Sequence, residues 1–310
     1  MATMRAVLPG PDGLAVGEVD RPEPGPVEVL VRVHAASVNP TDVKTVENGR
    51  RMDGGAATTP GYDVSGVVEA VGAGVRLYRP GDEVFGMIRF PHPGRAFADY
   101  VTAPPRHLAL KPAGVDHVHA AALPLVSLTA WQALVDIASV QPGQRVLIHA
   151  AAGGVGHVAV QLAKELGAHV IGTASAAKHD FLRSLGADEL IDYTATDFAD
   201  VLEGLDVVVD TMGGDYGERS LSVLRDGGVL VNLLPPASPD LVDKAAARAI
   251  PAGFMLVEPD HADMRTIARL AGSGKLRAET DTVLPLEEAQ KAHDRVATGR
   301  ARGKVVLTTV

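Results

Sequence analysis

A glycine-rich turn between a buried strand and a helix is the feature that most limits how this chain can fold. The stretch "RVLIHA" (145–150) is a continuous apolar run, as in strands buried on both faces. "AAGGVG" (151–156) follows, and then "HVAVQLAK", which has helical spacing. Such a turn lets backbone N–H groups approach a pyrophosphate. The turn residues that we expect to bind a dinucleotide are Ala152, Gly153, Gly154, Val155 and Gly156.

Strands and helices are expected to alternate after this turn. The predicted strands are "HVIGTA" (169–174), "DELIDY" (188–193), "LDVVVD" (205–210), "GVLVNLL" (228–234) and "GFMLVE" (253–258). The predicted helices begin near Gly154, Ala177, Ala199 and Tyr216, and "HAAALPLVSLTAWQALVDIA" (119–138) is a further helix. This alternation predicts an α/β domain with a doubly wound parallel sheet, the Rossmann arrangement.

The first third of the chain has a different pattern, with many short β-like runs. Examples are "VEVLVRVHAASV" (27–38), "DVSGVVEAVGAGV" (63–75) and "GDEVFGMI" (81–88), separated by Gly and Pro turns. Short strands joined by tight turns predict a small, partly open barrel. Two helices (262–274 and 286–299) and a strand, "KVVLTTV", end the chain, and the strand is expected to return to this first domain.

Composition excludes several classes of function. The 310 residues include no cysteine, which rules out disulfides, thiolate metal ligands and a cysteine nucleophile. The net charge of −9 argues against nucleic-acid binding. No apolar run approaches the ~18 residues that span a membrane. The first ten residues lack the apolar core of a signal peptide, so we expect a cytoplasmic protein.

The end of the second predicted strand lacks the acid that NAD-binding sites usually place there. Thr173, Ala174 and Ser175 occupy the position about twenty residues after the glycine turn. A carboxylate there accepts hydrogen bonds from the adenosine ribose of NADH and repels the 2′-phosphate of NADPH. Its absence removes that repulsion. We therefore expect the cofactor to be NADP(H).

Several blocks of the sequence resemble the zinc-independent quinone oxidoreductase branch of the medium-chain dehydrogenase/reductase superfamily. They are "ASVNPTDVK" (36–44), "PGYDVSGVVEAVGAGV" (60–75), "YRPGDEVFG" (78–86), "AALPLVSLTAWQAL" (121–134), residues 146–175 and "GRARGKVVL" (299–307). The resemblance implies a GroES-like β-barrel domain (1–122), a Rossmann NADP-binding domain (123–258) and a segment (259–310) that returns to the first domain. It also implies NADPH-linked reduction of quinones or α,β-unsaturated carbonyls.

The same resemblance implies cofactor contacts for individual residues. Asn39 is expected near the nicotinamide ribose and Thr129 at the nicotinamide end. The residues expected around the 2′-phosphate are Ser175, Lys178 and Tyr193, and those expected to flank the nicotinamide are Leu233, Leu234, Phe254, Met255 and Leu256. Alternatives stay open: Asn39 could cap a turn, Thr129 could bond its own backbone, Tyr193 could be a strand-end aromatic and Lys178 a solvated helix residue.

Zinc is not expected. Alcohol dehydrogenases of this superfamily bind catalytic zinc with a cysteine and the histidine of a "GHE" motif. Here the matching position reads Gly61-Tyr62-Asp63, and the four-cysteine lobe for structural zinc is missing. The catalytic candidates are Asn39 and Tyr62, and Tyr62 is a speculative proton donor.

The sequence also gives expectations for four histidines and leaves two competing functions open. His117 and His119 are expected at the surface, His149 as structural, and His92 in a loop that could border a substrate cleft. The competing functions are a zinc-independent carbonyl reductase and a non-catalytic NADPH-binding protein. A homodimer that pairs through "GFMLVE" is expected, because that strand would otherwise leave an apolar edge open.

Overall fold

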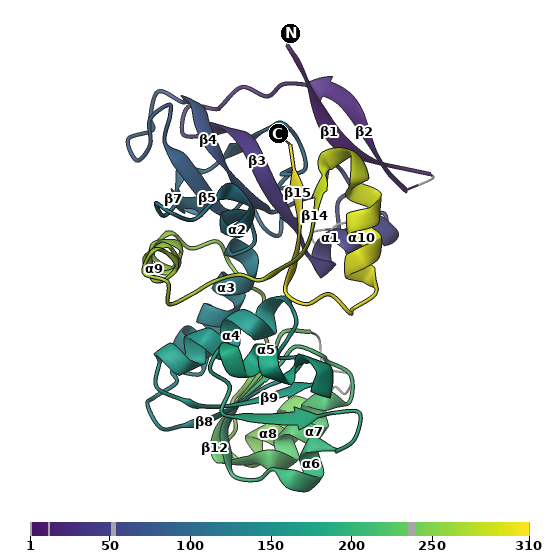
Figure 1. The fold of residues 1–310 in the computed structure, drawn as a ribbon, viewed down its shortest axis with the longest axis vertical. Helices are drawn as coiled ribbons and strands as arrows, with labels where there is room; N and C mark the ends of the chain where they lie inside the picture. Colours follow the sequence, from purple (N-terminus) through teal and green to yellow (C-terminus); the bar gives the residue numbers. More distant parts are fainter. Residues whose placement is uncertain (1, 12, 51–53, 235–239, 310) are drawn as a thin grey trace. The chain divides into compact units, whose positions relative to one another are not determined.

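The computed structural model describes residues 2–11, 13–50, 54–234 and 240–309. The chain forms two compact units, which we call unit 1 (Met1–Leu128 with Glu258–Val310) and unit 2 (Thr129–Val257). Figure 1 colours the ribbon along the sequence, so the purple start and the yellow end of the chain can both be found in unit 1.

Unit 1 is built on a mixed sheet with the strand order β14-β15-β3-β4-β5-β7. Strand β6 pairs with the first half of β3, whereas β15 pairs with its second half. A separate hairpin, β1–β2, stands beside the sheet. The strands of unit 1 are β1 Thr3–Gly10, β2 Gly13–Asp20, β3 Val29–Val38, β4 Asp63–Val71, β5 Glu83–Met87, β6 Tyr100–Ala103, β7 Leu108–Leu110, β14 Thr280–Pro285 and β15 Lys304–Thr308.

The end of the chain completes this sheet. Strand β15 pairs antiparallel with β3 and parallel with β14. Helix α10 packs against β14, β15 and β2, as Figure 1 shows. The helices of unit 1 are α1 Pro40–Glu47, α2 His117–Ala121, α9 His261–Gly272 and α10 Ala289–Ala297, with short 3-10 turns η1 Pro105–His107 and η4 Leu286–Glu288.

Unit 2 contains a parallel sheet with the order β10-β9-β8-β11-β12-β13. Counted from β8, this is the strand order 3-2-1-4-5-6 of a dinucleotide-binding fold. Its strands are β8 Arg145–Ile148, β9 His169–Ala174, β10 Glu189–Asp192, β11 Leu205–Asp210, β12 Leu224–Asn232 and β13 Ala252–Phe254. The expected α/β class and doubly wound sheet are confirmed.

Helices cover both faces of this sheet. In Figure 1, α4 and α5 lie on one side and α6, α7 and α8 on the other. Their bounds are α4 Gly154–Glu165, α5 His179–Ser184, α6 Phe198–Val201, α7 Tyr216–Val223 and α8 Leu241–Ala246, with a 3-10 turn η3 Ala176–Lys178 before α5. The apolar strands β8 and β11 are buried on both faces, which explains their continuous hydrophobic runs.

The structure corrects some predicted boundaries. The single helix expected at 119–138 is broken: α2 ends at Ala121, α3 (Pro124–Trp131) begins at a proline, and a π-helix (η2, Gln132–Ile137) follows. Proline has no N–H to donate, so it begins a helix more readily than it continues one. The strand expected at 253–258 ends at Phe254.

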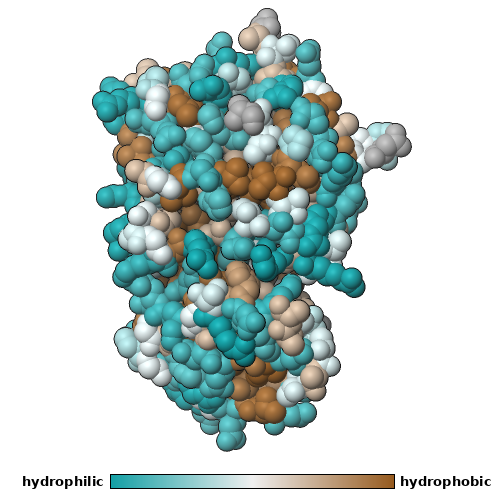
Figure 2. All heavy atoms as spheres, viewed as in Figure 1, coloured by the Kyte–Doolittle hydropathy of each residue, from teal (hydrophilic) through white to brown (hydrophobic). Residues whose placement is uncertain are grey.

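The exposed surface is mixed in character. Figure 2 shows hydrophilic side chains over most of the visible face, with apolar atoms in smaller groups between them. Within the described residues, no helix is long and apolar enough to cross a membrane.

Candidate functional site

The glycine turn forms the first part of the candidate site, between β8 and α4. A Cβ on Gly156 would lie 2.4 Å from the carbonyl oxygen of Ala150, so the close approach of helix and strand requires glycine there. A Cβ on Gly153 would meet only that oxygen, at 3.1 Å. Gly153 is the N-cap of α4 and caps it with no side chain. The first-turn N–H groups and the positive end of the helix dipole therefore suit a phosphate anion.

The threonine at the place of the expected acid is turned inward. Thr173 is 2% exposed, and its Oγ1 accepts the Ala150 N–H at 3.1 Å and lies 3.3 Å from Nδ1 of His149. Ala174 is also buried. Of the three residues at this strand end, only Ser175, which is half-buried, is exposed enough to contact an adenosine ribose.

Three of the predicted cofactor contacts lie at one edge of the sheet. In the parallel register Asp192 of β10 is paired with Ala174 of β9, so Ser175 and Tyr193 are the next residues on neighbouring strands. Ser175 precedes the turn that ends at Lys178, which is half-buried. Tyr193 is 57% exposed. The structure thus brings a hydroxyl, an ammonium and a phenol to the same sheet edge.

This edge also holds a carboxylate that the sequence analysis did not consider. Asp192 Oδ1 accepts the Thr194 hydroxyl at 2.7 Å and the Thr194 N–H at 3.0 Å. The hydroxyl bond is the main cause that lowers the pKa of Asp192. The sequence feature that could have pointed to Asp192 is an acidic residue at the end of the third strand, in "LIDY". The carboxylate also meets the backbone N–H of Ala176, so it lies beside the segment that carries Ser175 and Lys178.

The expected nicotinamide-flanking residues lie at the ends of β12 and β13, where Phe254 is the last residue of β13. The Leu233 N–H donates to the carbonyl of Asp210 at 2.8 Å, and the Met255 N–H donates to the carbonyl of Asn232 at 2.8 Å. Leu233 and Leu234 are half-buried, Met255 is buried, and Phe254 and Leu256 are exposed. These bonds fix the backbone after both strands.

Two buried polar atoms near these strand ends have no hydrogen-bond partner among the described residues. They are Oδ2 of Asp210 and Oδ1 of Asn232. Burial raises the pKa of Asp210, although its Oδ1 accepts the N–H groups of Met212 and Gly213. Neither residue was predicted; each ends a buried strand with a polar side chain, which is the signal that could have found them.

In unit 1, Asn39 lies in a buried polar cluster. The Asn39 side chain is fully buried, and its Nδ2 donates to Oδ2 of Asp63 at 2.9 Å. Its Oδ1 accepts a hydrogen bond from Nζ of Lys304. The Ser37 hydroxyl donates to the same Asp63 oxygen at 2.7 Å. The amide of Asn39 is therefore fixed between a cation and an anion, while its residue also forms the N-cap of α1.

Lys304 and Asp63 join distant parts of unit 1. Lys304 is 3% exposed, and its Nζ lies 3.6 Å from Oδ2 of Asp63. The other Asp63 oxygen accepts the N–H of Leu125, in the first turn of α3, at 2.8 Å. Burial lowers the pKa of Lys304, and the charges of Asp63 and Asp42 oppose that shift. Sequence reasoning missed this pair, since nothing local marks a contact between β4 and β15.

Asp42 connects Asn39 with the segment that carries Tyr62. Its carboxylate accepts the Asn39 N–H at 2.9 Å and the Gly61 N–H at 3.0 Å. Burial raises the pKa of Asp42 to about 7, and those two bonds oppose the shift. The ring of Tyr62 is 4% exposed and packs edge-on against Phe90 at 5.0 Å. Asp42 and Tyr62 both line a space of about 10 Å³, roughly the room for one water.

Thr129 is the first residue of unit 2 and lies on α3. Its side chain is 6% exposed. Its expected position at the nicotinamide end remains a prediction.

The histidines have separate environments. His149 is fully buried in unit 2, and the exposed His119 pairs with Asp116 at 2.8 Å. His117 is more enclosed than expected: its Nδ1 lies 2.8 Å from the Ser65 hydroxyl, and the centroid of its ring lies 4.3 Å from that of His34, with the two rings tilted by 36°. His92 lines a cavity of about 770 Å³ in unit 1, together with Arg95 and Tyr100.

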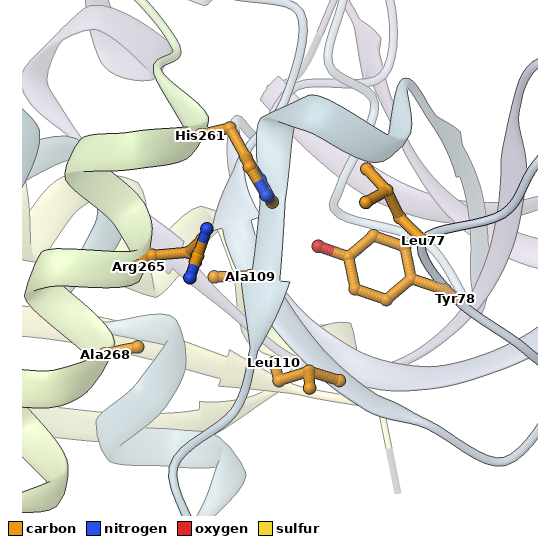
Figure 3. Close-up of a pocket in the computed structure, with 7 residues that line it drawn as sticks. All are labelled: Leu77, Tyr78, Ala109, Leu110, His261, Arg265 and Ala268. Carbon is orange, nitrogen blue, oxygen red and sulfur yellow. The ribbon is translucent and has the colours of Figure 1, made fainter.

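A second cavity in unit 1 contains none of the predicted site residues. It has a volume of about 350 Å³ and lies between α9 and β7 (Figure 3). The Tyr78 hydroxyl donates to the Leu108 carbonyl at 2.6 Å, and Nδ1 of His261 lies 2.9 Å from the same oxygen. Arg265 projects from α9 toward this space, whose other walls are mainly apolar. The polar groups of Tyr78 and His261 are thus used to fix the cavity wall.

Two family models match the chain. Residues 25–113 match the alcohol dehydrogenase GroES-like domain, and residues 185–307 match a family described as zinc-binding dehydrogenase. The first match lies in unit 1 and the second covers parts of both units.

Named relatives agree with these matches. The chain is 35% identical to the 2-methylene-furan-3-one reductase of Solanum lycopersicum, over 90% of this chain and 71% of that protein. It is 34% identical to the chloroplastic NADPH-dependent alkenal/one oxidoreductase of Arabidopsis thaliana, over 90% and 72%. The solved structure of the quinone oxidoreductase from Coxiella burnetii is 36% identical, with a TM-score of 0.92 over all of both chains.

Proposed function

The chain belongs to the quinone oxidoreductase branch of the medium-chain dehydrogenase/reductase superfamily, and from this premise we propose that it reduces quinones or α,β-unsaturated carbonyls with NADPH and without zinc. The observation that carries the proposal is the glycine turn on a parallel sheet whose second strand ends without an acid. The names of the tomato and Arabidopsis relatives support an enone or enal as the acceptor.

The preference for NADPH follows from the residues after β9 and β10. Ser175 can donate a hydrogen bond to a 2′-phosphate, and Lys178 can supply a positive charge one turn later. Tyr193 adds a phenol at the same edge. A charge-assisted hydrogen bond contributes roughly 1.5–3 kcal/mol, which is about ten- to a hundredfold in affinity. The carboxylate of Asp192 lies at this edge as well, and its negative charge opposes the preference.

Independence from zinc rests on the chemistry of the donor set. Tyr62 stands where a zinc-ligating histidine would, and its ring is packed against Phe90. The chain has no cysteine to supply a thiolate. In place of a metal site, this part of unit 1 holds the buried pair Lys304–Asp63. These residues support a reductase that works without zinc, although the matched family is described as zinc-binding.

The protein's part in the reaction is to bind, orient and protonate. When bound, NADPH supplies the hydride. The glycine turn and the first turn of α4 would hold the pyrophosphate, and the segments at the ends of β12 and β13 would flank the nicotinamide. Reduction of an enone at its β-carbon places negative charge on the carbonyl oxygen, which a hydrogen-bond donor stabilises. Tyr62 is the candidate proton donor, since it shares a small cavity with Asp42.

The acceptor is tested with matched pairs of substrates. Purified protein is mixed with NADPH and either an enone, the corresponding saturated ketone or a quinone, and the oxidation of NADPH is followed. We expect turnover with the enone or the quinone and little with the saturated ketone. Turnover of the ketone alone would instead identify a carbonyl reductase. Tight NADPH binding without any turnover would identify a non-catalytic binding protein.

We further propose a homodimer in the cytoplasm. Strand β13 is at the edge of its sheet, and Phe254 and Leu256 are 43% and 38% exposed beside it. An apolar edge of this kind favours pairing with a second copy. Light scattering at micromolar concentration is expected to give twice the monomer mass; the monomer mass would contradict this.

A further inference from the structure

The first residue of the dinucleotide turn has an unusual backbone conformation. Ala150 has φ = 45°, in the left-handed region of backbone conformation that residues other than glycine rarely adopt. Its carbonyl accepts the Gly153 N–H at 2.8 Å, which closes the turn, and this carbonyl also faces Gly156. A strained residue persists only where its surroundings impose the conformation.

Two buried side chains, those of Thr173 and His149, lie beneath the turn. The Ala150 N–H donates to Oγ1 of Thr173 at 3.1 Å, and this oxygen lies 3.3 Å from Nδ1 of His149. The other imidazole nitrogen lies 3.0 Å from the hydroxyl of Ser220 on α7. The chain Ala150–Thr173–His149–Ser220 therefore connects the turn to β9, β8 and α7.

His149 is held as a neutral, oriented ring. Its side chain is fully buried, and the rings of Phe198 and Tyr216 approach it edge-on at 4.5 and 5.0 Å. Burial lowers the pKa of His149 to about 3, with a further contribution from the charge of Arg219. A neutral imidazole has one donor and one acceptor nitrogen, which matches the two hydroxyl groups that it meets.

We propose that Thr173 and His149 are positioning residues for NADPH: they hold Ala150 in its left-handed conformation, so that the turn presents its N–H groups to the pyrophosphate. This inference rests on the proposed function. It gives a second reason for the missing acid after β9, because position 173 serves the turn and cannot also serve the ribose.

The test is the effect of the Thr173 hydroxyl on NADPH affinity. Thr173→Val keeps the shape of the side chain and removes the hydrogen bond, so NADPH is expected to bind about tenfold more weakly. Thr173→Ser keeps the hydroxyl and is expected to bind nearly as the wild type does. Adenosine 2′-monophosphate, which has no pyrophosphate, is expected to bind all three proteins equally.

A double substitution separates positioning from general destabilisation. Glycine adopts the left-handed conformation without penalty, so in an Ala150→Gly background Thr173→Val is expected to weaken NADPH binding by no more than about threefold. Ser222→Ala, which removes an exposed hydroxyl of α7 that donates to the Arg219 carbonyl, serves as the control and is expected to bind NADPH as the wild type does. If Thr173→Val does not fold, Thr173→Ala against Thr173→Ser makes the same comparison of a side chain with and without a hydroxyl.

Several results would overturn the inference. They are unchanged NADPH affinity in Thr173→Val, the same loss in both backgrounds, or an equal loss for adenosine 2′-monophosphate. Any of these results with a wild-type protein that binds NADPH would overturn the inference alone, whereas a wild-type protein that does not bind NADPH would overturn the proposed function and the inference with it.

Discussion

Replacing Lys304 by methionine is expected to lower the free energy of unfolding strongly, although Lys304 is far in sequence from Asn39 and Tyr62, the predicted site residues of unit 1. The ammonium of Lys304 contacts Oδ1 of Asn39, the carbonyl of Val38 at 3.3 Å and a carboxylate oxygen of Asp63 at 3.6 Å. Methionine keeps most of the apolar volume and removes the charge. Asp63 would then be a buried carboxylate without its cation.

The expected magnitude follows from burial. Removing one partner of a buried ion pair typically costs about 3–5 kcal/mol, because the remaining charge cannot reach water. Lys304 and Asp63 are 3% and 0% exposed, so this range applies to them. The matched control is Lys291→Met: Lys291 pairs with Glu288 at 3.0 Å but is 69% exposed. An exposed pair contributes only about 0–1 kcal/mol.

Urea unfolding followed by circular dichroism gives the free energy of unfolding of each variant. Hydrogen exchange in peptides from residues 29–71 then shows whether the loss lies in unit 1. The double variant Lys304→Met/Asp63→Asn is expected to cost less than the sum of the two single changes, since it leaves no unpaired charge. If Lys304→Met stays within about 1 kcal/mol of the wild type, or if the two changes are additive, the buried pair does not have the role argued here.

Three further predictions concern the cofactor, zinc and pH. Lys178→Ala is expected to lower kcat/KM with NADPH about ten- to a hundredfold and to leave kcat/KM with NADH nearly unchanged. Ser175→Asp is expected to narrow or reverse the preference for NADPH over NADH. Steady-state kinetics with both cofactors test this, and an equal loss for both cofactors would refute the proposed 2′-phosphate site. Metal analysis is expected to find no stoichiometric zinc, and turnover is expected to be unchanged after treatment with a chelator. Stoichiometric zinc with turnover that the chelator abolishes would contradict this prediction. The pKa of His149 in the fold, about 3, lies below its ordinary 6.5, so its contribution to stability is complete above pH 6.5 and is lost as the pH falls toward 3. Between pH 7.5 and 5 the wild type is expected to lose about 2 kcal/mol more unfolding free energy than His149→Gln, and equal losses would show that the imidazole is not held neutral.

The fold of unit 2 could be predicted well because its signals are local. The predicted strands 169–174 and 205–210 coincide with β9 and β11, and α4 and α7 begin at the predicted residues. Buried parallel strands are continuous apolar runs, and a glycine turn precedes α4. The hairpin β1–β2 and helix α1 were not predicted, since neither has a strong period in its sequence.

The polar clusters could not be predicted because they depend on contacts between distant segments. Asn39 and Lys304 are 265 residues apart in the chain. Asn39 is expected near the nicotinamide ribose, which stays a prediction, and the bonds of its amide to Lys304 and Asp63 could not be foreseen from the sequence. Likewise, sequence spacing placed Thr173 at the strand end, but only the folded turn shows that its hydroxyl holds Ala150.

The most direct test of the central claim is to follow the hydride itself. NADPH deuterated at C4 of the nicotinamide, in separate samples for the two faces, is incubated with the protein and an enone, and the product is examined by NMR. The proposed function predicts deuterium at the β-carbon of a saturated ketone, from one face of the cofactor only. Deuterium on a carbinol carbon with the double bond intact, or no oxidation of NADPH with either the enone or a quinone, would contradict it.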